Sequence, residues 1–268
     1  MMGELALRYP PHTLVVSTGS YPDSAELDGR FPQIIDRAGI RATRLRTING
    51  LVLWSARAGR LAQRHRFGFT WCGELKPAGY PAWWIAQRRG IPYGVVVHGT
   101  ELLLLDAKIR RSRFKRWTAG GLVARATVLV ANSAWTGDLA RRVYELLGRP
   151  DLAARVQVVP LGTDPTQFRP GIDARSVRAR HGLGGGPWLL TVARLEWHKG
   201  IDTVIRALPA IRAAHPGVRY AVAGVGPRQG ELEQIAGQAG VRHAVKFLGF
   251  VAEEDLPALY NAADLYAG

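Results

Sequence analysis

The chain has 268 residues, of which 47% are hydrophobic and 21% charged, and its formal net charge is +15. These proportions are close to those of soluble globular proteins, so they exclude a disordered chain. No stretch approaches the roughly 18 continuous apolar residues of a membrane span. The single cysteine, Cys72, has no partner for an internal disulfide, which favours a reducing, cytoplasmic location.

The basic excess is compatible with anionic partners such as nucleic acid, a membrane surface or a phosphorylated substrate. Only five of the 36 basic residues are lysine, and the arginines are spread along the whole chain, as a GC-rich genome would also produce. Charge alone therefore does not choose a partner. The segment 108–117 interleaves basic and apolar residues, a pattern typical of either a helix lying on an anionic bilayer or a solvated helix face.

Through the first 160 residues, short apolar runs rich in β-branched residues alternate with longer helical patterns. This alternation predicts parallel strands covered by helices on both faces. The expected strands are residues 12–17, 67–72, 93–97, 127–131 and 156–160, and the helical stretches between them include residues 77–89 and 136–147.

A second alternation follows the turn-rich segments at residues 168–171 and 182–187. It predicts strands at 188–192, 219–223 and 245–248, helices at 201–213, 231–239 and 254–262, and a last strand starting at Leu265. We therefore expect an α/β fold of two Rossmann-like domains, residues 1–168 and 187–268, with a linker at 169–186. Both domains are expected to be incomplete at the chain ends.

Two cations mark the loop after the strand 188–192. Arg194 and Lys199 precede the helix expected from Ile201, at the end where the helix dipole disfavours positive charge. Their position is explained if a polyanion such as a diphosphate lies between them. The alternative is that they are ordinary surface charges on a loop.

His98 follows the buried strand 93–97 and precedes Gly99. Ligands of open α/β sheets bind at the carboxyl ends of the strands, so His98 is a candidate site residue rather than a core histidine. In contrast, Ser133 is expected to be a structural helix N-cap.

The glycines after the strand 219–223 are a weaker signal. Gly224 and Gly226 can present backbone N–H groups to an anion, but the third glycine comes one residue late for a dinucleotide fingerprint and Pro227 intrudes. No two aspartates stand two residues apart, no histidines have metal-ligand spacing, and one cysteine cannot build a zinc site. The sequence therefore gives no reason to expect a metal.

Taken in order, these motifs resemble the family-four retaining glycosyltransferases. The resemblance covers nearly the whole chain and is carried by the segments 97–101, 130–136, 159–164 with Phe168, 192–200, 220–227, 247–251 and 259–265. It implies the GT-B architecture, in which two Rossmann-like domains face each other across a cleft and the C-terminal domain holds a nucleoside diphosphate sugar.

The resemblance also implies residue roles. Arg194 and Lys199 bind the donor diphosphate and stabilise it as it leaves, which agrees with the argument from charge and dipole. His98 is the catalytic residue that contacts the transferred sugar, and the backbone at Gly249 and Val251 reads the nucleotide base. Because protein cations stabilise the leaving group, no metal cofactor is implied.

The implied activity is retaining transfer of a hexose to a lipid-linked or polysaccharide acceptor, in cell-envelope glycan or glycolipid synthesis. The enzyme is expected in the cytoplasm, in peripheral contact with the inner face of an anionic membrane. Family members also have a first strand with a glycine-rich loop and a pair of glutamates near the sugar, and neither is found in this chain. The chain by itself is therefore expected to be a poor catalyst, and the alternative is a non-catalytic nucleotide-sugar-binding remnant. Nucleic-acid binding is disfavoured because no basic platform rich in aromatic residues is present.

Overall fold

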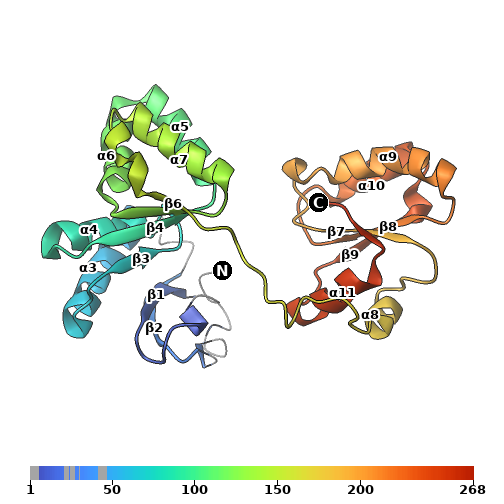
Figure 1. Cartoon of the computed structure of the whole chain (residues 1–268), viewed down its shortest axis with the longest axis horizontal. Coiled ribbons are helices and arrows are strands. Elements are labelled where there is room, and N and C mark those ends of the chain that lie inside the picture. The colour runs from blue at the N-terminus through green and yellow to red at the C-terminus, as the bar shows by residue number, and fades with distance from the viewer. Residues whose placement is uncertain (1–5, 21–23, 25–27, 30, 42–46) are drawn as a thin grey trace. The chain divides into compact units, whose positions relative to one another are not determined.

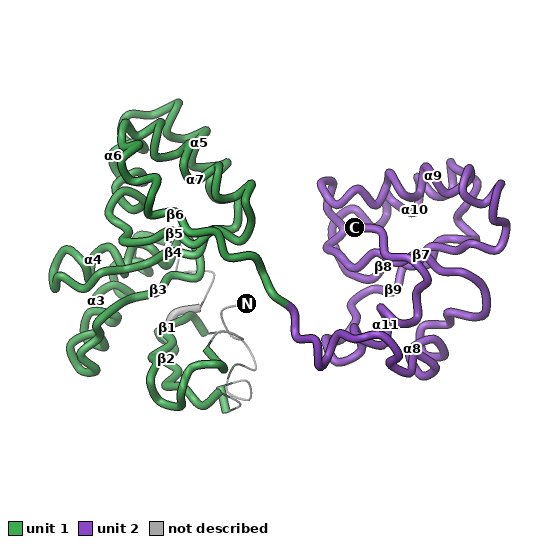
Figure 2. Tube along the Cα trace, in the orientation of Figure 1, with its two compact units in different colours: residues 1–162 green, residues 163–268 purple. Residues whose placement is uncertain are grey.

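A computed structural model describes residues 6–20, 24, 28–29, 31–41 and 47–268 (Figure 1). The chain forms two compact units, residues 1–162 and 163–268, which Figure 2 shows in different colours. Each unit contains its own parallel four-stranded sheet and its own hydrophobic core. None of the helices in these described ranges is long and apolar enough to cross a membrane.

The first unit contains a four-stranded sheet and a separate pair of strands, both parallel. The pair is β1 (Val15–Ser20) with β2 (Ile34–Arg41), and the larger sheet has the order β3 (Thr70–Cys72), β4 (Tyr93–Val97), β5 (Val128–Ala131) and β6 (Val156–Val158). The helices are α3 (Ile48–His65), α4 (Gly79–Arg89), α5 (Thr100–Arg111), α6 (Arg113–Arg125) and α7 (Ala134–Leu146), and a 3₁₀ helix covers Pro150–Arg155.

Strand β4 lies at the centre of the core of the first unit. All five of its residues are buried, as expected for a strand covered on both faces. The hydroxyl of Tyr93 donates to the carbonyl of Leu122, and that of Tyr144 donates to the carbonyl of Val123. Both buried hydroxyls therefore have hydrogen-bond partners, and the two bonds connect β4 and α7 to α6.

A buried carboxylate attaches β1 and β2 to α3. Asp36 on β2 accepts hydrogen bonds from Ser17 on β1 (3.1 Å) and from Arg57 on α3 (2.6–3.0 Å). Trp54, also on α3, donates to Ser17 at 2.9 Å. Because Asp36 is only 7% exposed, its charge needs this partner from another element.

The second unit is a smaller α/β layer. Its sheet has the order β10 (Leu265–Tyr266), β7 (Trp188–Val192), β8 (Arg219–Ala223) and β9 (Val245–Gly249), all parallel. The helices are α8 (Arg175–Arg180), α9 (Ile201–Ala214), α10 (Gln229–Gln238) and α11 (Leu256–Ala262). Short 3₁₀ helices lie at Trp197–Lys199, Arg242–Ala244 and Glu253–Asp255.

The expected α/β class with parallel sheets is confirmed. The strands expected at 93–97, 188–192 and 219–223 have those bounds, whereas β2 was not expected at all. Residues 169–186, expected as a linker, contain α8, and Val177 and Leu183 are buried in a core of the second unit. The division between the compact units comes earlier, after Gly162.

Candidate functional site

The two predicted cations lie on the loop that connects β7 to α9. Arg194 and Lys199 have exposed side chains, and α9 begins at Ile201 after an N-cap glycine that offers no side-chain acceptor. Neither cation is joined to a carboxylate by an ion pair in the described part of the chain. Positive charge at a helix N-terminus is unfavourable, so this arrangement suits a bound anion.

The turn after β8 holds this loop in place. Leu195 donates its N–H to the carbonyl of Val225 at 3.2 Å and accepts from the N–H of Arg228 at 3.4 Å. A Cβ atom at Gly224 would lie 1.9 Å from the carbonyl oxygen of Ala193, and one at Gly226 would lie 2.6 Å from that of Leu195. Both positions therefore require glycine because the two backbones approach so closely.

Gly224 differs in one respect from its expected role. Its N–H donates to the carbonyl of Gly249 at 2.7 Å, so this amide joins two loops of the fold and is not directed at an anion. Its φ of +136° also lies in a region that other residues rarely adopt. Both glycines thus shape the loop of Arg194, and the expectation that the N–H of Gly226 faces a phosphate stays a prediction.

The predicted base-reading segment begins at Gly249, the last residue of β9. Gly249 has a φ of +69°, and Val251 is only 8% exposed because its side chain belongs to the core formed with α8 and α11. A ligand at this segment can therefore meet the backbone of Val251 but not its side chain. The neighbouring Phe250 is 76% exposed, and sequence reasoning did not single it out.

In the first unit, His98 lies at the carboxyl end of β4 with an exposed ring. Its Nε2 is 2.9 Å from the carbonyl oxygen of Gly73, and because a carbonyl only accepts, Nε2 carries the proton. In the neutral ring, Nδ1 is then left as a hydrogen-bond acceptor. Gly99 gives the turn its shape, since its φ is +87° and a Cβ there would lie 2.8 Å from the ring of Trp135.

Glu101 positions this histidine, a role that the sequence did not reveal. Its carboxylate accepts from the N–H of Leu75 at 2.8 Å and from the N–H of His98 at 3.2 Å. Burial raises its pKa, and the two backbone donors oppose that shift. From sequence alone Glu101 is an ordinary acid in the first turn of a helix.

The expected N-cap at Ser133 is confirmed, because its side chain accepts a hydrogen bond from the N–H of Thr136.

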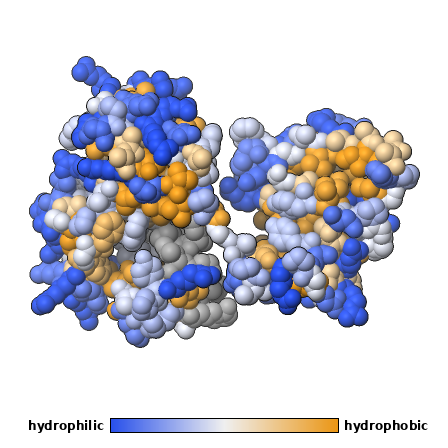
Figure 3. Space-filling model, viewed as in Figure 1, coloured by the Kyte–Doolittle hydropathy of each residue, from blue (hydrophilic) through white to orange (hydrophobic). Residues whose placement is uncertain are grey.

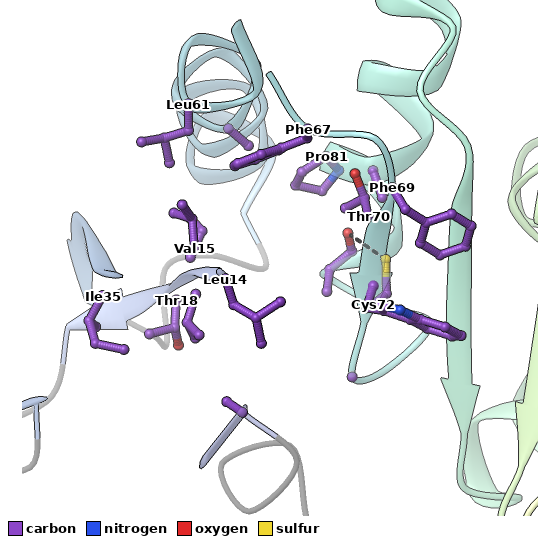
Figure 4. Close-up of a pocket in the computed structure, with 18 of the residues that line it drawn as sticks. Leu14, Val15, Thr18, Ile35, Leu61, Phe67, Phe69, Thr70, Cys72 and Pro81 are labelled. Carbon is purple, nitrogen blue, oxygen red and sulfur yellow. Dashed lines mark hydrogen bonds between the residues drawn. The ribbon is translucent and has the colours of Figure 1, made fainter. Parts of the chain in front are cut away.

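Two cavities adjoin His98 within the first unit. The larger, of about 850 Å³, lies between β1, β3, α3 and α4 and is lined mostly by apolar side chains (Figure 4). Thr70 borders it, and the hydroxyl of this residue is buried without a hydrogen-bond partner. The smaller, of about 370 Å³, lies at the start of α5 and contains two lysines.

No group of three or more histidine, cysteine or acidic residues is arranged to hold a metal ion among the residues that the structure describes. The expectation that the reaction needs no metal remains a prediction.

Two family profiles match the chain. Residues 5–167 match Glycosyltransferase Family 4, and residues 173–267 match Glycosyl transferases group 1. The two Rossmann-like units are those of the GT-B glycosyltransferase fold. The chain belongs to Glycosyltransferase Family 4.

Among curated relatives, the chain is 39% identical over 116 residues to the GDP-mannose-dependent alpha-(1-6)-phosphatidylinositol monomannoside mannosyltransferase of Mycobacterium tuberculosis, a match covering 43% of this chain and 30% of the relative. It is 32% identical over 198 residues to the glycogen synthase of the same species, covering 69% of this chain and 42% of the relative. The chain thus spans less than half the length of these relatives.

Among solved structures, Anabaena Alr3699/HepE in complex with UDP and glucose has a TM-score of 0.68 at 20% identity, covering 94% of this chain and 65% of the other. WaaG, described as a glycosyltransferase involved in lipopolysaccharide biosynthesis, has a TM-score of 0.57 at 18% identity, covering 95% and 66%. These likenesses show the fold.

The close approach at Gly224 makes a prediction about stability. Gly224→Ala is expected to lower the free energy of unfolding of the second unit by about 3 kcal/mol, because the backbone of Ala193 must move. Hydrogen exchange of β7 and β8 measures this change. Gly237→Ala in α10, where no atom would meet the new Cβ, is the matched control and should stabilise by about 1 kcal/mol. Equal exchange in the Gly224 variant and the unmodified chain would contradict the role given to this glycine.

Proposed function

We propose that this chain is part of a retaining hexosyltransferase that takes its sugar from a nucleoside diphosphate donor. The observation that carries the proposal is the pair Arg194 and Lys199, unpaired in the described structure and placed at the N-terminus of α9. Family membership supports it, as do a relative named for its dependence on GDP-mannose and a similar structure in complex with UDP and glucose.

The chemistry follows from charge. When the glycosidic bond to the donor breaks, the diphosphate gains negative charge, and cations already fixed around it stabilise that change. Each charge-assisted hydrogen bond from Arg194 or Lys199 contributes roughly 1.5–3 kcal/mol. We assign the backbone of Gly249 and Val251 to the base, and His98 to the transferred sugar, toward which Nδ1 of a neutral ring would offer an acceptor.

The acceptor is proposed to be lipid-linked or a polysaccharide, and the surface of α5 and α6 favours the lipid. Phe114 is 65% and Trp117 77% exposed on α6, and Leu103 and Leu104 are exposed on α5. Basic residues surround them, and the ammonium group of Lys115 lies over the ring of Phe114. Such a mixture suits peripheral contact with an anionic membrane. Figure 3 shows a further apolar patch on this unit, over α7 and the end of β6.

The first unit also has room for the additional strand that the family resemblance implies. Residues of β1 and of β3 both line the large cavity, and among the described strands each has one pairing neighbour, β2 and β4 respectively. We propose that a parallel apolar strand fills this space and joins the two sheets of the unit. Its carboxyl end would lie by Gly73 and His98, where the family has its glycine-rich loop.

The donor proposal predicts the behaviour of two variants. Arg194→Met and Lys199→Met are each expected to weaken binding of UDP or GDP about tenfold or more, measured by calorimetry. Arg206→Met, which removes an exposed cation further along α9, is the control and should bind as the unmodified chain does. Unchanged affinity in both variants would remove the basis of the proposal. Normal donor binding without sugar transfer by a longer gene product would favour the non-catalytic alternative.

The membrane proposal predicts salt-sensitive binding to vesicles. The chain should sediment with vesicles of phosphatidylglycerol and phosphatidylcholine at low salt, and much less in high salt, because charge screening weakens the attraction. Replacing both Phe114 and Trp117 by Ser should reduce binding severalfold, whereas Leu53→Ser, at an exposed apolar position on α3, should not. Absence of binding at any salt concentration would refute membrane contact through α5 and α6.

The strand proposal predicts a change in hydrogen exchange. A short synthetic peptide rich in valine and isoleucine should slow exchange of the amides in β1 and β3 by pairing with their unpaired edges. The same peptide with a central proline cannot complete the ladder and serves as the control. No slowing in either strand, or equal slowing with both peptides, would show that the cavity does not accept a strand.

A further inference from the structure

The smaller cavity of the first unit is lined by two lysines from different elements. Lys76 comes from the loop before α4 and Lys108 from the last turn of α5. The same wall contains His98 and an apolar strip, formed by Leu75, Leu104 and Leu105. A pocket with an apolar wall and convergent charges has the character of a ligand site.

Two acidic residues, Glu74 and Glu101, line the same pocket as the two lysines. Glu101 directs its carboxylate to two backbone N–H groups, and Glu74 also has an interaction partner. No ion pair joins Lys76 or Lys108 to a carboxylate within the described ranges. Burial, and after it the charges of Lys108 and Lys115, lowers the pKa of Lys76.

Lys76 is half-buried and Lys108 exposed, and two positive charges that repel each other on one wall favour an anion between them. Lysine is a compact point charge with three donors, and it commonly binds phosphate in proteins. Because Leu104 is exposed and continues into the apolar surface of α5 and α6, an anion held here can carry an apolar chain outward.

We propose that Lys76 and Lys108 bind a phosphate group of the acceptor. The pocket shares His98 with the site assigned to sugar transfer, so we identify its ligand as the acceptor. This identification rests on the proposed transferase function. The phosphate belongs to either a lipid or a small sugar-like phosphate, and both present the same charge to the lysines. Lys76 and Lys108 thus determine which acceptors reach His98.

The test is binding of three probes by the full chain, measured by calorimetry. Dihexanoyl phosphatidic acid and glycerol 3-phosphate carry phosphate, and dihexanoylglycerol does not. Lys76→Gln and Lys108→Gln should each weaken binding of the phosphate probes roughly tenfold. Lys115→Gln removes the same charge outside the pocket wall and should change affinity about threefold or less. Tighter binding of phosphatidic acid than of glycerol 3-phosphate identifies a lipid source, and equal binding identifies a small phosphate.

Equal affinity of all variants and the unmodified chain for the phosphate probes would overturn the proposal. A loss of affinity in Lys115→Gln as large as in Lys76→Gln and Lys108→Gln would also overturn it, because the overall positive charge of the surface would then explain binding. If Lys76→Gln does not fold, protection of Lys76 against acetylation by phosphatidic acid, compared with Lys246 in the second unit, gives the same answer. Binding of UDP by these variants separates the two proposals: it should be unchanged. If Lys76→Gln and Lys108→Gln lose phosphate binding but the unmodified protein transfers sugar to no acceptor, the phosphate site is supported and only the transferase function is contradicted.

Discussion

The loop carrying Arg194 and Lys199 lies where it does because two glycines let a neighbouring turn approach its backbone. Gly224 and Gly226 remove the side chains that would collide with Ala193 and Leu195, and backbone hydrogen bonds then join the loops after β7, β8 and β9. The cations therefore lie at the N-terminus of α9, and neither forms an ion pair with a carboxylate among the described residues. This charge arrangement is unfavourable without a bound anion, which is the basis for proposing a diphosphate as its ligand.

The first unit has a comparable arrangement at the end of β4. The carboxylate of Glu101 joins the loop at Leu75 to the backbone of His98, and the ring of His98 donates to Gly73. The histidine is therefore oriented by contacts to the loop between β3 and α4, and the smaller cavity beside it is lined by charged and apolar side chains. In the proposed transferase, the second unit would stabilise the leaving group, and the first would select the acceptor around His98.

Most strands of the fold were predictable from the sequence, and the elements and residue roles that were not have a physical cause. Strands β4, β7 and β8 consist mostly of apolar residues, so the local pattern was sufficient to place them. Strand β2 was missed because Asp36 interrupts its apolar pattern, and the charge of Asp36 is satisfied by Arg57 from α3. The roles of Glu101 and of the Gly224 amide were also hidden, since each depends on a partner about 25 residues away in the chain.

A crystal structure of this chain with bound UDP or GDP tests the central claim most directly. The account predicts that the diphosphate lies between the side chains of Arg194 and Lys199, at the N-terminus of α9, with the base against the backbone of residues 249–251. A diphosphate bound elsewhere, with both cations still directed into solvent, would contradict it.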